Sequence, residues 1–261
     1  MDTRFWGPSG WRLLHSITFA YTPNTDRKAM QTFFEMLPFV LPCKYCRANL
    51  TEHMQKHPLA QALHSRETLT KWLWRIHNEV NTKLRSQKLS TEKDPPFEAV
   101  EKYYTDLLRT GCTRTEFPGW DFLFSIAECH PMSLVSKQSV PIQGAPPCDL
   151  LVKYEEKNLW NCLKPDERFP LYVLFWESLG AVLPFPEWRA SWLKNGGFDD
   201  GALTTRDQTL KWLWNLRCAM ETELELLNRC KYSALCKTLK VFRSGCTKSS
   251  RAKTCRKKRS S

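Results

Sequence analysis

Three aromatic-rich segments occur twice in this chain of 261 residues, and they occur in the same order both times. The matched pairs are residues 11–17 with 120–126, residues 34–42 with 176–184, and residues 68–74 with 208–214. Apolar side chains within these segments recur at spacings of three and four, which is the period of a helix buried on one face. An ordered repeat of this kind predicts two similar helical units.

Helical period also dominates the rest of the chain, and little of it alternates as a strand does. We therefore expect an all-α fold with a first domain at residues 1–111, a second at 112–243 and a basic flexible tail at 244–261. The first domain should hold five helices: one from Pro8 to Tyr21, one after a cap at Asn24 or Thr25, one from Cys43 to His57, one opened by Ser65 and Thr68, and one at 97–108. The second domain carries an insert near residues 132–165, which we interpret as an irregular connection.

A close pair of cysteines opens the third predicted helix. Cys43 and Cys46 flank two residues directly after Pro42, and the positive end of a helix dipole favours thiolate there. Such a pair is consistent with a redox disulfide, with half of a zinc site or with coincidence. The chain has 11 cysteines, an odd number, so they cannot all pair within it.

Polar residues gather on one face of the fourth predicted helix. His77, Asn78 and Asn81 lie there beside tryptophans, and Trp11 with His15 could form an opposite wall. Rings stack on tryptophan and amides bond to ring edges, so the set suits a flat heteroaromatic ligand. The alternative is that these residues are core aromatics and an ordinary buried histidine.

The second unit lacks these polar and sulfur positions but keeps the apolar ones. Phe185 and Trp188 stand where the first unit has its cysteine pair, and Phe124 stands at the position of His15. Arg217 and Glu221 occupy the positions of His77 and Asn81. This pattern indicates a copy that is retained for packing after losing its chemistry.

Taken together, residues 6–11 with His15, the Cys43–Cys46 pair and residues 74–84 resemble the Erv/ALR family of FAD-dependent sulfhydryl oxidases. The resemblance covers about residues 5 to 110. It implies a five-helix FAD-binding bundle, here followed by a second, degenerate helical bundle. It also implies an enzyme that makes disulfides in reduced protein substrates.

The resemblance assigns roles to individual residues. Cys43 is expected to exchange with substrate thiols, and Cys46 is expected to lie next to the flavin, with O2 as final acceptor and H2O2 as product. No metal is expected. The residues expected to line FAD are Trp6, Gly7, Trp11, His15, Tyr21, Trp74, His77, Asn78, Val80, Asn81, Lys83 and Leu84.

The chain departs from the family in its other cysteines. Cellular members commonly have a further pair soon after the His-Asn motif, whereas this chain has no cysteine from residue 47 to residue 111. Cys246 and Cys255 in the tail are a possible shuttle pair, and the alternative is that they are unpaired or form one local disulfide. The degenerate unit resembles the second module of quiescin-type and some viral oxidases, which implies a homodimer or an intramolecular pseudo-dimer.

The basic tail and the histidines after the cysteine pair are consistent with two functions other than an oxidase. The formal charge of +12 is concentrated in the tail, and a nucleic-acid-binding role is the less favoured interpretation of it. A zinc-stabilised interaction module would need His53 and His57 to complete the cysteine pair. We expect no membrane helix and no cleaved signal peptide, and hence a cytoplasmic protein, in the host cytoplasm or the virion if the source is a large DNA virus.

Overall fold

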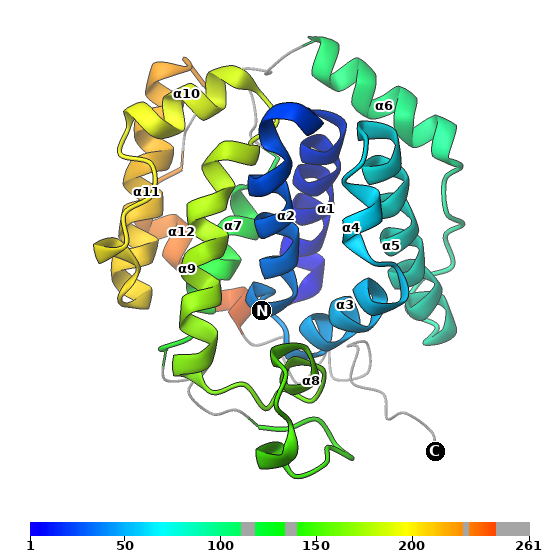
Figure 1. Ribbon diagram of the computed structural model, residues 1–261. Helices are drawn as coiled ribbons and strands as arrows, with labels where there is room; N and C mark the ends of the chain where they lie inside the picture. The colour runs from blue at the N-terminus through cyan, green and yellow to red at the C-terminus, as the bar shows by residue number, and fades with distance from the viewer. Residues whose placement is uncertain (111–117, 134–139, 227–229, 244–261) are drawn as a thin grey trace.

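The computed structural model describes residues 1–110, 118–133, 140–226 and 230–243, and within these ranges every regular element is helical. Twelve α-helices and two short 3-10 helices are present there (Figure 1). The all-α prediction is confirmed.

Six helices form the first half of the chain. They are α1 Thr3–Phe19, α2 Pro23–Val40, α3 Lys44–Lys56, α4 Leu59–Ala62, α5 Arg66–Ser86 and α6 Phe97–Thr110. The sequence predicted five, because the four residues of α4 are too few to show a period. Helix α2 also begins earlier than predicted: Thr22 is its N-cap and Pro23 its first residue, a position that needs no backbone N–H donor.

The start of α5 is the best predicted boundary in this half. The Ser65 side chain accepts a hydrogen bond from the Thr68 backbone N–H, and the Thr68 hydroxyl accepts one from the Ser65 backbone. This reciprocal cap satisfies two of the N–H groups that a helix leaves unpaired at its start. It fixes the register of the helix that carries His77.

The second half contains α7 Trp120–Glu128, α8 Tyr154–Leu159, α9 Pro165–Val182, α10 Pro186–Lys194, α11 Arg206–Glu223 and α12 Tyr232–Arg243, with 3-10 turns at Cys148–Leu150 and Gly201–Leu203. The insert is more ordered than the sequence predicted, because α8 and the turn at Cys148–Leu150 lie within it. Figure 1 shows this insert at the bottom of the molecule, beside α3.

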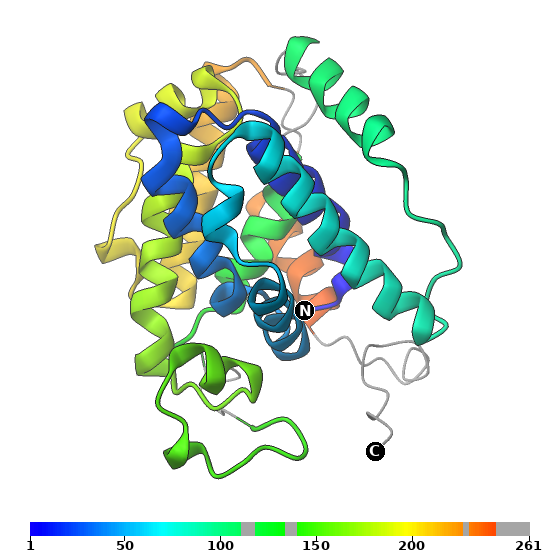
Figure 2. The ribbon, with the colours of Figure 1, turned by 45° about the vertical axis from the view of Figure 1, so that its right-hand side comes forward.

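A single hydrophobic cluster runs through both halves. Its centre is the pair α2 and α9, which run alongside each other in both ribbon views (Figure 2). The Phe33 ring of α2 stacks on the Phe175 ring of α9 with centroids 5.2 Å apart, and both side chains are fully buried. Burying one such ring contributes about 2–3 kcal/mol to folding, so the two halves stabilise each other.

Corresponding positions in the two halves have closely similar local geometry. Leu41 follows α2 with φ −51° and ψ 138°, and Leu183 follows α9 with φ −52° and ψ 139°. The rings of Phe34 and Trp72 meet edge to face at 5.2 Å. Those of Trp176 and Trp212, their counterparts in the repeat, meet edge to face at 5.4 Å.

The described helices vary in length and in apolar character. None of them combines the length and the apolar character needed to span a membrane.

Candidate active site

The cysteine pair lies at the start of α3, as predicted. Cys43 is the N-cap, with an extended backbone, and its Sγ accepts a hydrogen bond from the Cys46 backbone N–H at 3.4 Å. The helix start thus directs an otherwise unpaired N–H donor at the sulfur.

This environment makes the Cys43 thiol acidic. Its pKa falls to about 6, because the Cys46 side chain and then the Cys46 backbone N–H donate hydrogen bonds to it, and the charges of Arg47 and the N-terminal ammonium add to the effect. Burial opposes the shift, since it disfavours a charged sulfur. At neutral pH most Cys43 is therefore thiolate, the form that exchanges with disulfides.

A group of stacked rings joins α1, α5 and α6. The Trp11 and His77 rings are nearly parallel with centroids 3.9 Å apart, and the His15 Nε2 lies 3.1 Å from the His77 Nδ1. On its other side His15 stacks against Tyr104 of α6, with centroids 5.1 Å apart. The structure thus brings together three of the predicted FAD-lining residues: Trp11, His15 and His77.

Both histidines are neutral at physiological pH. Burial lowers the pKa of His15 to about 3, with a smaller contribution from His77, and burial lowers the pKa of His77 to about 4. Neutral imidazoles each offer one donor and one acceptor to a ligand.

Two buried nitrogen atoms near this region have no hydrogen-bond partner within the protein: the Nδ1 of His15 and the Nε2 of His53. An unsatisfied buried polar atom is costly unless a ligand or water meets it. In addition, a Cβ added at Gly7 of α1 would have no atom within 4 Å. The residues present therefore fit a flat ring system with hydrogen-bonding edges, as FAD has.

Further predicted residues on α5 contact neighbouring segments. The Asn81 amide donates to Asp94 Oδ1 at 2.8 Å, the Lys83 ammonium donates to Asn49 of α3, and the Trp74 indole N–H donates to the Pro95 carbonyl at 3.1 Å. The same helix carries the partly exposed residues Asn78, Val80 and Leu84. These contacts fix the position of α5 relative to α3 and α6.

Two other predicted residues also pack against other parts of the protein. Tyr21 is fully buried and its hydroxyl donates to the Leu63 carbonyl at 2.9 Å. Trp6 lies 5.8 Å from the ring of Phe122 on α7.

Several residues of the site were not predicted. Tyr104 covers His15, Asn49 accepts from Lys83, and Arg47 adds positive charge near Cys43. The sequence did carry a signal for two of them, because Asn49 and Arg47 follow the cysteine pair on the same helix. No sequence pattern near Tyr104 indicated its role, because its contact with α1 depends on where α6 packs.

In the second half, an ion pair lies at the positions that the sequence repeat aligns with His77 and Asn81. The Arg217 guanidinium lies 5.5 Å from the Trp120 ring and 5.9 Å from the Phe124 ring, and its Nε donates to Glu221 at 2.8 Å. Phe185 and Trp188, which replace the cysteine pair, are buried with their rings 5.7 Å apart.

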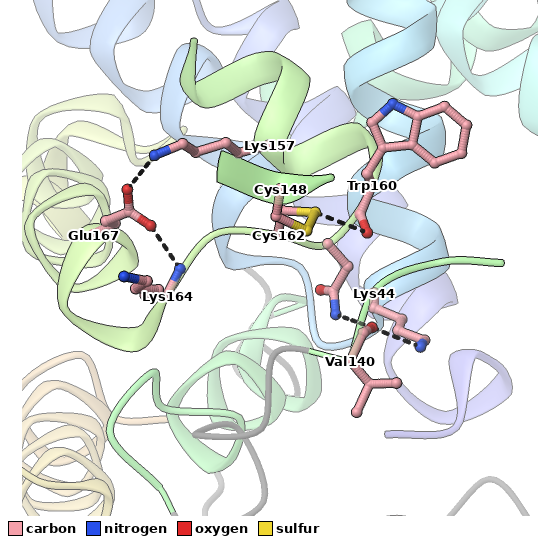
Figure 3. The surroundings of a disulfide bond; sticks show 9 residues. Lys44, Val140, Cys148, Lys157, Trp160, Cys162, Lys164 and Glu167 are labelled. Atoms are coloured by element: carbon pink, nitrogen blue, oxygen red, sulfur yellow. Dashed lines mark hydrogen bonds and ion pairs between the residues drawn. A yellow bond between two sulfur atoms is a disulfide. The ribbon is translucent and has the colours of Figure 1, made fainter. Parts of the chain in front are cut away.

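Two of the remaining cysteines are bonded to each other. Cys148 and Cys162, for which the sequence suggested no partners, form a disulfide with each other (Figure 3). The possible shuttle residues Cys246 and Cys255 lie outside the described residues. As for the zinc alternative, no group of three metal-ligating side chains occurs within the described ranges, and the His57 Nε2 lies 3.3 Å from Glu79.

Comparison with known proteins identifies relatives of the first half. The sequence profile of the Erv1/Alr family matches residues 8–104. A probable FAD-linked sulfhydryl oxidase of Acanthamoeba polyphaga mimivirus is 38% identical over 109 residues, which is 40% of this chain and 75% of that protein. The FAD-linked sulfhydryl oxidase of an African swine fever virus isolate is 35% identical over 89 residues, covering 33% of this chain and 72% of that protein.

A cellular relative is more distant. The mitochondrial FAD-linked sulfhydryl oxidase of Saccharomyces cerevisiae is 33% identical over 90 residues, covering 33% of this chain and 47% of that protein. No solved structure gives a significant match. The cysteine pair at a helix start, the ring cluster on α1 and α5 and these matches lead to one conclusion: the chain belongs to the Erv1/Alr family.

Proposed function

We propose that this protein is an FAD-linked sulfhydryl oxidase that forms disulfides in protein substrates, with Cys43 and Cys46 as its redox pair. The observation that carries the proposal is the capped, acidic Cys43 thiol at the start of α3. A thiolate stabilised in this way is both a good nucleophile and a good leaving group near neutral pH. The names of the viral and yeast relatives support the same activity.

The exchange reaction follows from the roles of the two sulfurs. A substrate thiolate attacks Cys43 Sγ of the oxidised pair, and Cys46 leaves as a thiolate. A second substrate thiolate then attacks the substrate sulfur of this mixed disulfide, the substrate leaves as a disulfide, and Cys43 leaves as a thiolate. Two electrons pass to the cysteine pair, and the hydrogen bond from the Cys46 backbone N–H favours the second step by stabilising the Cys43 leaving group.

The face of α3 that carries Cys46 supports its assignment as the flavin-side cysteine. Asn49 and His53 follow Cys46 at spacings of three and seven, so the three side chains share a helix face. Asn49 accepts from Lys83 of α5, and so this face is directed towards the helix that carries His77. Cys43, the N-cap, is the sulfur left for the substrate.

The predicted ligand residues would hold FAD between α1, α3 and α5. Trp11 and His77 offer ring faces, and the Nδ1 of His15 offers an unsatisfied hydrogen-bonding atom. The Nε2 of His53, a residue that the sequence did not assign to FAD, offers another. When bound, FAD supplies a two-electron acceptor for the reduced cysteine pair and transfers the electrons to O2, which leaves as H2O2.

We further propose that residues 112–243 are a degenerate copy of the first domain. The matched geometry at Leu41 and Leu183 supports this, and so does the ion pair of Arg217 and Glu221 at the position of the histidine cluster. Packing of α2 on α9 supports an intramolecular pseudo-dimer, in which the second copy takes the place of a partner subunit.

The viral origin of two of these relatives supports a viral source for the chain. A location in the host cytoplasm or the virion is part of the proposal. Immunolocalisation in infected cells would test it.

One experiment tests the oxidase proposal directly. The purified protein should be yellow, and adding a dithiol under nitrogen should bleach the flavin absorption, which should return when air is admitted. A colourless protein, or a flavin that dithiol does not reduce, contradicts the proposed activity.

A further inference from the structure

Arg47 is a buried cation with an unusual set of partners. Its side chain is only 8% exposed, with Nη1 donating to the Leu41 carbonyl at 3.0 Å and Nη2 donating to Asn161 Oδ1 at 2.7 Å. No carboxylate within the described ranges forms an ion pair with it. Burying a charge is costly unless an opposite charge or several hydrogen bonds compensate, so the position of Arg47 calls for a functional reason.

The guanidinium is directed back towards the start of α3. Arg47 lies in the first turn of α3, and its backbone N–H donates to the Cys43 carbonyl at 3.0 Å. The carbonyl that Nη1 contacts belongs to Leu41, two residues before Cys43. From this position the Arg47 charge acts electrostatically on the Cys43 sulfur.

Asn161 belongs to the insert and lies more than a hundred residues from Arg47 along the chain. Its backbone is left-handed, with φ 56°, and its amide nitrogen donates to the Val140 carbonyl at 2.8 Å. The same carbonyl accepts from Lys44, which lies between the two active-site cysteines (Figure 3). The next residue, Cys162, is tied to Cys148 by the disulfide.

We propose that Asn161 and Arg47 are positioning residues of the redox site: the insert holds the Arg47 guanidinium beside Cys43, where its charge stabilises the thiolate. Neither residue has to touch the substrate, because both act through Cys43. The insert is then a part of the active site contributed by the second half of the chain. The inference deepens the proposed function, on which its biological meaning rests.

Other charged and titratable groups also face this part of α3. The N-terminal ammonium donates to the Pro42 carbonyl at 3.2 Å, and the Cys129 thiol at the end of α7 donates to the same carbonyl at 3.6 Å. Arg168 of α9 is buried and acts electrostatically on both Arg47 and Cys129, and Glu128 acts on Cys129. All remain in place in the variants below, so differences between variants report on Arg47 and Asn161.

The test measures thiol acidity rather than turnover. Protein reduced with limiting dithiol under nitrogen is pulsed with iodoacetamide at a series of pH values, and alkylation of the Cys43 peptide is quantified by mass spectrometry. The same digest reports whether the Cys148–Cys162 disulfide stayed closed. The wild-type midpoint should lie at about pH 6.

Arg47→Met should raise this midpoint by about one pH unit, the size expected for losing one nearby opposite charge. Arg47→Lys should restore part of the difference, because the charge remains but the two-armed hydrogen bonding is lost. Asn161→Gly removes the amide and still permits the left-handed backbone, and its shift should be smaller. Asn161→Asp places a carboxylate on Arg47, and its shift should approach that of Arg47→Met.

Asn158→Ala is the matched control. Asn158 lies in the same insert and donates to the Pro38 carbonyl and to Thr51, so its loss loosens the insert without touching Arg47. Its midpoint should remain that of the wild type. Circular dichroism checks folding, and the nearly isosteric Asn161→Asp keeps the proposal testable if Arg47→Met does not fold.

Two results would overturn the proposal. The first is an unchanged alkylation midpoint in Arg47→Met, or in Asn161→Asp if Arg47→Met does not fold. The second is an equal shift of the midpoint in Asn161→Gly and in the control Asn158→Ala. Shifted midpoints in a protein without oxidase turnover would leave the positioning role intact and refute only the proposed function. Normal oxidase turnover with unchanged midpoints would refute the positioning role and leave the proposed function intact.

Discussion

The Nε2 atom of His15 lies 3.1 Å from the Nδ1 atom of His77, so one imidazole donates a hydrogen bond to the other between α1 and α5. One proton can lie between these two nitrogen atoms, but two cannot. Burial lowers the pKa of His15 to about 3 and that of His77 to about 4, well below the ordinary 6.5. The site therefore depends on both rings being neutral.

The first prediction concerns stability in acid. Above pH 6.5 both histidines are neutral whether the chain is folded or unfolded, and they cause no pH dependence. Below pH 6.5 the unfolded chain binds the protons first, so the free energy of unfolding falls until the pH reaches the folded-state pKa values. At pH 5 the loss should be on the order of 2 kcal/mol for each histidine.

His15→Phe should remove about half of that loss, and phenylalanine is the residue that the second copy carries at this position. Urea unfolding of the flavin-free protein at pH 7 and pH 5 measures this loss of unfolding free energy. Substitution of the exposed His64 by glutamine is the control. A wild-type pH dependence in His15→Phe would show that the buried histidine pair is not the cause.

The second prediction concerns the redox pair. Cys43→Ser and Cys46→Ser should each abolish dithiol-dependent oxygen uptake, since one sulfur cannot form the intramolecular disulfide that the exchange needs. An oxygen electrode measures the rate. Cys236→Ser on α12 is the control and should retain full activity; appreciable turnover in either active-site variant is incompatible with the mechanism.

The third prediction concerns how much flavin binds. One FAD per chain is expected, because in the proposed degenerate copy the Arg217–Glu221 ion pair takes the position of the histidine cluster. His77→Ala should lose most of the bound flavin and Arg217→Gln should keep it, as measured by absorption of the released cofactor against protein concentration. Two flavins per chain would contradict the degenerate-copy proposal.

The fourth prediction concerns packing in the second half. A Cβ on Gly180 of α9 would lie 2.5 Å from a ring atom of Trp192, which is itself buried against Trp212. Gly180→Ala should therefore destabilise the protein by about 1–3 kcal/mol. Thermal unfolding of the flavin-free protein measures the change.

Gly7→Ala is the matched substitution in the first half, where the added methyl group meets nothing within 4 Å. It should stabilise α1 by up to about 1 kcal/mol, since alanine favours a helix more than glycine does. A loss of stability there equal to that of Gly180→Ala would mean that contact with Trp192 is not the deciding factor.

The sequence alone gave a correct account of local features. The Ser65–Thr68 cap, the start of α3 at the cysteine pair and the face of α5 that carries His77 all depend on residues three or four apart, which interact within one helix. The family followed from the order of such local signals. The weakest predictions were the start of α1, which begins at Thr3 and not at Pro8, the boundary at Pro23, the short helix α4 and the order within the insert. In these stretches no period is long enough to detect.

Contacts between distant segments were decided by the tertiary structure alone. The Cys148–Cys162 disulfide, the stacking of Tyr104 on His15 and the bond from Arg47 to Asn161 join residues whose spacing carries no periodic signal. The first two each lie within one half of the chain and depend on how the insert and α6 fold back. The bond from Arg47 to Asn161 joins the two halves, which pack through α2 and α9. The sequence determined which helices form and which of them carries the sulfur pair; the packing of those helices decided which buried charge lies beside it.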